Sequence, residues 1–133
     1  MSTVPMVEFE QATGLVKEVY DDMIATRKMT RIPNFWKTLA THPPTLASTW
    51  SEWKAVMGTP GRLDRLTKEM IAVAVSATNR STYCVNAHSA AAIKAGMDKE
   101  MLGELMAVIG FFNKVNRMSD GYQVEPDIFP KME

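Results

Sequence analysis

The residues best suited to chemistry in this chain are a cysteine and a histidine four positions apart, Cys84 and His88. Cys84 is the only cysteine of the sequence, and His88 is one of only two histidines. Residues four apart lie on the same face of a helix, so this thiol and this imidazole are placed to share a proton. The spacing indicates a reactive thiol with a proton acceptor one turn away.

Ser81 stands three residues before Cys84, at the position where a dithiol redox motif carries its second sulfur. A lone thiol cannot close an internal disulfide. We expect Ser81 to cap a helix over residues 82–95, which makes Cys84 the third helical residue. Unpaired backbone amides and the positive end of the helix dipole favour an anionic sulfur at that place.

A structural interpretation of the same residues stays open on spacing alone. Single cysteines are often buried as small hydrophobic side chains, and a lone helical histidine often satisfies one hydrogen bond in the core. Ser81 needs no role beyond its cap, although its hydroxyl is also placed to hydrogen-bond a thiolate, a sulfenate or a substrate oxygen.

The rest of the chain must supply the elements that position these groups. Apolar residues recur at three- to four-residue spacing almost throughout, and strand-like alternation is nearly absent. Asp64 and Asp98 are suited to cap two of the helices. The pattern predicts an all-α bundle of five or six helices, over residues 14–28, 35–40, 43–57, 65–77, 82–95 and 98–120.

Composition limits the classes of partner. A chain of 133 residues with 46% hydrophobic content suits a single domain, which we expect over residues 1–133. Fifteen basic and fifteen acidic residues cancel, which disfavours nucleic acid or an anionic membrane as partner and leaves a small molecule. With neither a signal peptide nor a membrane span evident, and one cysteine suited to a reducing compartment, we expect a cytoplasmic protein.

Two helices are expected to need a partner chain. The segment 70–77 is almost wholly apolar, so we expect it to be buried on most sides. The helix after Ser81 carries five alanines, whose small side chains let another backbone approach but bury little area. These features predict a homo-oligomer.

A wider pattern around the thiol resembles a known family. Glu69, position 81 twelve residues later, Tyr83, Cys84 and His88 resemble the signature of the carboxymuconolactone decarboxylase and alkylhydroperoxidase D-like (AhpD-like) superfamily. The resemblance covers roughly residues 30–124. It also includes residues 31–34, the His42-Pro43 helix start, and residues 63–69, 95–97 and 113–117.

The resemblance implies an AhpD-like helical bundle that forms dimers, trimers or hexamers, with an active site near subunit contacts. In the peroxidase branch, cysteines at the positions of Ser81 and Cys84 cycle between dithiol and disulfide, and Cys84 matches the one that meets the peroxide. Residues matching Glu69 and His88 relay protons. In the decarboxylase branch the substrate is a small carboxylated lactone, and the dithiol is not needed. This chain departs from the peroxidase pattern at Ser81.

Glu69 is a further candidate for the proton chemistry, and three other residues are weaker candidates for the site. Glu69 is either solvated near its helix start or turned inward beside His88 as a proton shuttle. Tyr83, Trp53 and Arg117 could bind substrate, through an oxyanion, an apolar pocket wall and a carboxylate respectively, although packing or a surface ion pair is the commoner role of each. One cysteine and two histidines do not suggest a metal site, and no phosphate-binding glycine loop is present, so we expect no cofactor.

Three hypotheses of function follow. The first is a peroxidase-like oxidoreductase that depends on Cys84, with Glu69 and His88 as the proton relay and an external thiol, or Cys84 of a neighbouring subunit, as reductant. The second is a lyase of the carboxymuconolactone decarboxylase type, in which Cys84 is a spectator. The third is a family member that binds a small ligand without catalysis.

Overall fold

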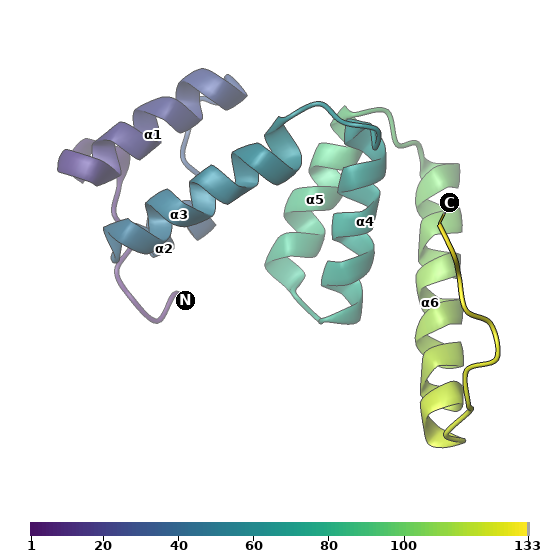
Figure 1. Ribbon diagram of the computed structural model, residues 1–133. Helices are drawn as coiled ribbons and strands as arrows, with labels where there is room; N and C mark the ends of the chain where they lie inside the picture. The colour runs from purple at the N-terminus through teal and green to yellow at the C-terminus, as the bar shows by residue number, and fades with distance from the viewer. Residues whose placement is uncertain (133) are drawn as a thin grey trace. The chain divides into compact units, whose positions relative to one another are not determined.

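The computed structural model describes residues 1–132, and every regular element in them is helical (Figure 1). The all-α prediction is confirmed. The elements are the 3-10 helix η1 (Phe9–Gln11), the α-helices α1 (Gly14–Arg27), α2 (Asn34–Leu39) and α3 (Pro43–Trp53), the π-helical turn η2 (Lys54–Gly58), and the α-helices α4 (Arg65–Thr78), α5 (Thr82–Lys94) and α6 (Lys99–Gly121).

The contacts of the chain gather into two compact units, Met1–Thr59 and the part from Pro60 onward. The single domain expected over residues 1–133 stays a prediction. In the part of the chain that is described, no helix combines the length and the apolar character needed to cross a membrane.

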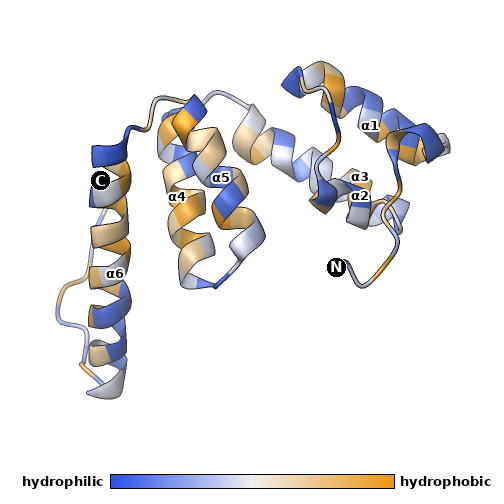
Figure 2. Ribbon diagram, turned by 180° about the vertical axis from the view of Figure 1, so that it is seen from behind, coloured by the Kyte–Doolittle hydropathy of each residue, from blue (hydrophilic) through white to orange (hydrophobic). Residues whose placement is uncertain are grey.

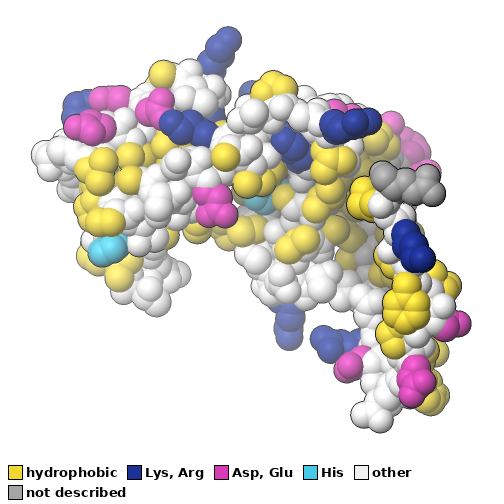
Figure 3. Space-filling view, viewed as in Figure 1, with side chains coloured by type: hydrophobic (Ala, Val, Ile, Leu, Met, Phe, Trp, Pro, Cys, Tyr) yellow, Lys and Arg dark blue, Asp and Glu magenta, His cyan; other side chains and the backbone are white. Residues whose placement is uncertain are grey.

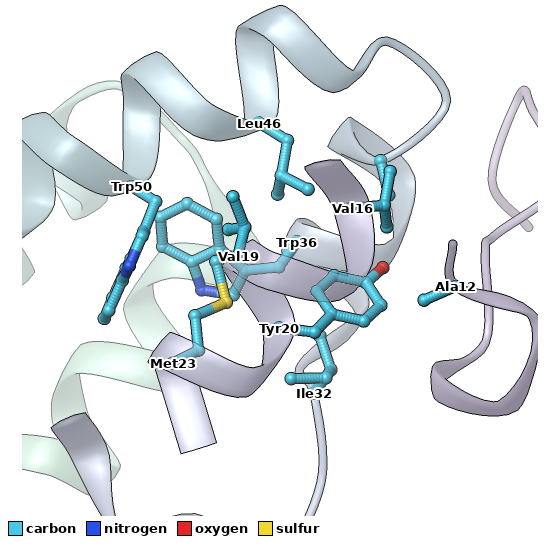
Figure 4. Packing of buried hydrophobic residues seen from close by; sticks show 10 residues of the cluster. Ala12, Val16, Val19, Tyr20, Met23, Ile32, Trp36, Leu46 and Trp50 are labelled. Atoms are coloured by element: carbon cyan, nitrogen blue, oxygen red, sulfur yellow. The ribbon is translucent and has the colours of Figure 1, made fainter. Parts of the chain in front are cut away.

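The first unit is held together by a core from α1, α2 and α3 (Figure 4). Tyr20 and Met23 of α1 are fully buried beside Leu46 of α3, and the rings of Trp36 and Trp50 meet edge to face with centroids 5.7 Å apart. The Tyr20 hydroxyl donates to the Val7 carbonyl at 2.9 Å. Burial, aided by the charge of Glu8, raises the pKa of Tyr20 to about 12, so Tyr20 is a neutral hydrogen-bond donor.

The second unit contains a hairpin of α4 and α5, followed by α6 (Figure 1). Asp64 accepts a hydrogen bond from the Thr67 amide at 2.7 Å, and Asp98 accepts one from the Met101 amide at 2.8 Å. Both predicted caps are therefore confirmed, and they fix where α4 and α6 begin.

Two helices of this unit end in the same backbone motif. At the end of α5, Gly96 has a φ of 113°, and the Met97 amide donates back to the Ala92 carbonyl at 2.9 Å. At the end of α4, Arg80 takes the equivalent left-handed conformation with a φ of 61°, and the Ser81 amide donates to the Ser76 carbonyl at 2.9 Å. Glycine meets this conformation without strain, whereas arginine does so at a cost.

Much apolar surface in the second unit stays exposed within the chain. The buried residues of α4 are Glu69, Val73 and Ser76, whereas Ile71 and Val75 are 48% and 54% exposed. The expectation that residues 70–77 would be buried on most sides is thus wrong for the isolated chain, because only one face of α4 is covered. No residue of α6 is buried, although apolar residues recur along this helix (Figure 2) and hydrophobic side chains reach the surface of this unit (Figure 3).

Candidate active site

The centre of the candidate site is the carboxylate of Glu69, which is 1% exposed on the covered face of α4. Its Oε1 accepts a hydrogen bond from Nε of Arg65 at 2.7 Å and lies 2.6 Å from Nη2 of the same side chain. Its Oε2 lies 2.7 Å from Nδ1 of His88 on α5. Both carboxylate oxygens are therefore satisfied, as a buried carboxylate requires.

The contacts of Glu69 settle its charge. Burial acts to raise the pKa of this carboxyl group, but the hydrogen bond from His88 and the positive charge of Arg65 outweigh burial and lower the pKa below its usual value. Glu69 is consequently ionised at neutral pH. Glu69 is thus turned inward beside His88 and is not solvated, and its role as a proton shuttle stays a prediction.

An ionised carboxylate fixes the proton on the histidine ring. Because a carboxylate can only accept hydrogen bonds, Nδ1 of His88 must carry the proton that lies between His88 and Glu69. In the neutral ring, Nε2 then holds a lone pair and can act as a base. His88 is 28% exposed at its side chain, so a small molecule can reach the ring.

Cys84 is the third residue of α5, as the sequence predicts, and it is a free thiol of intermediate exposure. The partly covered face of α5 includes Ser81, Cys84, Val85 and His88, followed by the buried Ala92. Cys84 thus lies one turn before His88 on the face that contacts α4. The first amide of α5 that bonds back along the helix is that of Val85, which donates to the Ser81 carbonyl at 2.9 Å, so the amides before it belong to the unpaired helix start.

Ser81 occupies the N-cap position of α5, but its side chain makes no capping hydrogen bond there. The expected cap through the hydroxyl is therefore wrong. The backbone explains the difference: the Ser81 amide is bound to the end of α4, and with φ at −91° and ψ at 90° Ser81 follows the turn set by Arg80.

The three weaker candidates lie in different places. Tyr83 precedes Cys84 and is exposed on the first turn of α5. Trp53 belongs to the first unit, where it stacks on Trp50 at 5.1 Å and lies 4.7 Å from the Arg27 guanidinium. Arg117 is an exposed residue of α6. The structure joins Glu69 to His88, with Cys84 on the same face, and the substrate-binding roles of the other three stay predictions.

Arg65 is the residue of this cluster that the sequence prediction missed. A signal was present, since Arg65 precedes Glu69 by one helical turn. A basic residue is also out of place at the positive end of a helix, and such local conflicts often mark functional positions.

These features define a class: an all-helical protein in which a buried glutamate on one helix holds a histidine on the next, one turn after a cysteine. The chain belongs to the carboxymuconolactone decarboxylase family, whose sequence profile matches residues 44–124. The superfamily expected from the sequence is confirmed. At the level of the family, this membership supports peroxidase-like or decarboxylase-type chemistry.

A solved structure agrees with this assignment. The chain is similar to the crystal structure of the alkylhydroperoxidase AhpD core from Rhodospirillum rubrum ATCC 11170, with 38% sequence identity and a TM-score of 0.92. The similarity covers 96% of this chain and 95% of that chain. A search of curated proteins found no match to the chain.

Proposed function

We propose that the protein is a thiol-dependent, alkylhydroperoxidase-like oxidoreductase in which Cys84 is the reactive group and Glu69 and His88 relay its proton. The observation that carries this proposal is the 2.7 Å contact of Glu69 with His88, one helical turn after the only cysteine. The similarity to the alkylhydroperoxidase AhpD core adds support.

The proposed reaction assigns one step to each of these groups. His88 accepts the Cys84 proton at Nε2, while Glu69 stabilises the resulting imidazolium at Nδ1. The thiolate attacks the terminal oxygen of a hydroperoxide, an S–O bond forms and the O–O bond breaks. Sulfur is oxidised to a sulfenic acid and the peroxide is reduced to an alkoxide, which takes the proton back from His88 as the alcohol leaves.

The second half of the cycle needs a reductant outside this pair of helices. Because Ser81 has no sulfur, the sulfenic acid reacts with an external thiol, which gives water and a mixed disulfide. A second thiol then releases Cys84 as a thiolate, and the external pair leaves as a disulfide. Cys84 of a neighbouring subunit is the other thiol that could react with the sulfenic acid.

The first experiment measures whether Cys84 is activated at all. The rate of its alkylation is followed by intact mass from about pH 5 to 9, in wild type and in Glu69→Gln. We expect wild type to react faster near neutral pH than an unperturbed thiol, and Glu69→Gln to react more slowly. A wild-type rate no greater than that of an ordinary thiol would favour a ligand-binding role without catalysis.

Peroxide turnover then tests the cysteine directly. Cys84→Ala should abolish the reduction of an alkyl hydroperoxide in the presence of a dithiol, whereas Ser81→Ala, which keeps the thiol, should remain active. Full turnover by Cys84→Ala would contradict the proposal.

A lyase of the carboxymuconolactone decarboxylase type is the second candidate. The observation that favours it is that the buried Glu69 contacts are complete without the thiol, while the second sulfur of a dithiol is missing. His88 and Glu69 would then act as base and charge partner on a small carboxylated ring. In that case Cys84→Ala retains activity on such a substrate and His88→Ala loses it.

We also infer that the protein forms a homo-oligomer through its second unit. Phe111 and Phe112 of α6 are both more than half exposed, and an apolar groove of about 370 Å³ between α4 and α6 is bordered by Val75, Val108 and Phe112. A monomer seldom leaves this much apolar surface in water. Analytical ultracentrifugation should show an oligomer in wild type and a smaller species in Phe112→Glu, with Lys114→Glu as the control on the same helix.

A further inference from the structure

The geometry of Arg65 assigns it a part in the proton chemistry of the site. It contacts one oxygen of Glu69 with Nε at 2.7 Å and Nη2 at 2.6 Å, while the other oxygen faces Nδ1 of His88 at 2.7 Å. One buried carboxylate therefore lies between a permanent cation and a ring that can become a cation. A change in the charge of either partner therefore alters the interaction of Glu69 with the other partner.

The charged groups that act on Glu69 come from both helices of the hairpin. Arg65 belongs to α4 and His88 to α5, and among the described residues these two account for the charge effects on this carboxylate. Cys84 is the other titratable side chain on this face of α5, one turn before His88. Arg65 is 43% exposed at its side chain, so water and salt weaken its effect without removing it.

We propose that Arg65 is a positioning residue that holds the Glu69–His88 pair in the form with a single proton, on Nδ1 of His88, so that Nε2 remains a base. Its positive charge disfavours a second proton on the pair. Without that charge, Glu69 stabilises the imidazolium more strongly or takes up a proton itself. A second proton on the ring occupies the lone pair of Nε2, and a proton on Glu69 removes the charge that orients Nδ1–H of His88.

The location of Arg65 supports a role beyond helix stability. At the first position of α4 its charge faces the positive end of the helix dipole, and an arginine one turn before a glutamate is the weaker order for a surface pair. A residue selected only to stabilise the helix start would carry the opposite charge.

The test is a nitrogen-15 NMR titration of the histidine rings in the resting protein, with no peroxide present. Arg65→Gln keeps hydrogen-bond donors but removes the charge, and Arg65→Lys keeps the charge. We expect the pair to take up its second proton about one pH unit higher in Arg65→Gln than in wild type, with Arg65→Lys close to wild type. His42, whose Nδ1 lies 2.7 Å from the Thr45 hydroxyl in the first unit, is the internal reference and should not move.

An unchanged midpoint in Arg65→Gln, with a native circular dichroism spectrum, would overturn the proposal. So would equal shifts in Arg65→Gln and Arg65→Lys, because these would report a lost contact rather than a lost charge. The inference rests on the proposed function only in one respect, which is that Nε2 of His88 accepts the proton of Cys84. If Cys84 does not react with peroxide, the proposed function is wrong, but the NMR result on Arg65 is unaffected.

A kinetic readout completes the test. The acidic limb of the pH profile for Cys84 alkylation should move to higher pH in Arg65→Gln, in parallel with the NMR midpoint. A variant that lost rate equally at every pH would show that Arg65 is only structural.

Discussion

Glu69 and His88 meet across the α4–α5 hairpin although they are nineteen positions apart in the chain. Their contact depends on two helical registers and on the turn between them, so it is not set by local sequence. The carboxylate end of the pair is closed off from solvent, whereas the imidazole end is partly open. A proton relay needs this asymmetry, since one end must hold a charge and the other must meet a reactant.

The ionised state of Glu69 should be visible in the acid stability of the protein. Its pKa in the folded state is lowered from 4.5, so the contribution of Glu69 to stability is present above that pH and is lost as the pH falls through the folded-state pKa. Wild type should therefore lose free energy of unfolding on acidification below about pH 4.5 more steeply than Glu69→Gln. At neutral pH the variant should be less stable by roughly 2–4 kcal/mol.

Urea unfolding followed by circular dichroism at several pH values measures this difference. Glu104→Gln is the control, because Glu104 is an exposed residue of α6 in the same unit. Equal acid dependence in wild type and Glu69→Gln would show that Glu69 carries no stabilised charge.

If the proposed peroxide chemistry holds, a second sulfur at position 81 should raise peroxide turnover. Ser81→Cys places a thiol three residues before Cys84, at the spacing of a dithiol motif. The sulfenic acid can then be resolved within the chain, so peroxide consumption with a dithiol reductant should rise. Thr82→Cys is the matched control, since residues two apart do not face each other on a helix. An equal rise in both variants, or none in Ser81→Cys, would count against the geometry.

Arg80 should be a site where glycine stabilises the protein. Its φ of 61° closes the end of α4. The left-handed conformation is costly for any residue that carries a Cβ, arginine included, and glycine avoids that cost. Arg80→Gly should raise the free energy of unfolding by about 0.5–1 kcal/mol, measured by urea unfolding.

The reverse change provides the control. Gly96 occupies the equivalent position at the end of α5 with a φ of 113°, so Gly96→Ala should lower stability by about 1 kcal/mol or more. The argument would be wrong if both substitutions moved stability in the same direction.

Asp22 should stabilise the first unit through its contacts with Trp50 and Lys54. Both the indole Nε1 and the Lys54 ammonium lie 2.7 Å from Asp22 Oδ2, and these two hydrogen bonds, that of Lys54 first, lower the pKa of the carboxyl group. Asp22→Ala leaves the N–H of a buried tryptophan without its acceptor, which should cost about 1–2 kcal/mol.

Tryptophan fluorescence during unfolding measures this effect, because all three tryptophans lie within residues 1–59. The neighbouring substitution Asp21→Ala removes only an exposed pair with Lys17 and should cost less than about 0.5 kcal/mol. Comparable losses in the two variants would show that the Trp50 contact contributes little.

Local chemistry in the sequence predicted most of the helical framework. Asp64 and Asp98 start helices where short polar side chains precede apolar periodicity, and Gly96 ends one where only glycine is relaxed. The pairing of Glu69 with His88 came from the family resemblance, since nothing local joins residues on two helices.

The misses have equally physical causes. Ser81 has the right side chain for a cap, but the turn set by Arg80 decides its conformation, and that turn depends on the end of the preceding helix. The contact of Arg65 with Glu69 was not predicted, because it depends on Glu69 pointing inward. The exposure of Ile71 and Val75 depends on what else packs on α4, which an apolar segment alone does not reveal.

The hydrogen bond from the Ser81 amide to the Ser76 carbonyl has an evolutionary consequence. It joins the start of α5 to the end of α4 through backbone atoms alone, and the Ser81 hydroxyl makes no capping hydrogen bond. Serine and cysteine can therefore replace each other at position 81 with the hairpin unchanged. A lineage on this fold can gain or lose a second cysteine at this position by one substitution, with the contact between Glu69 and His88 kept.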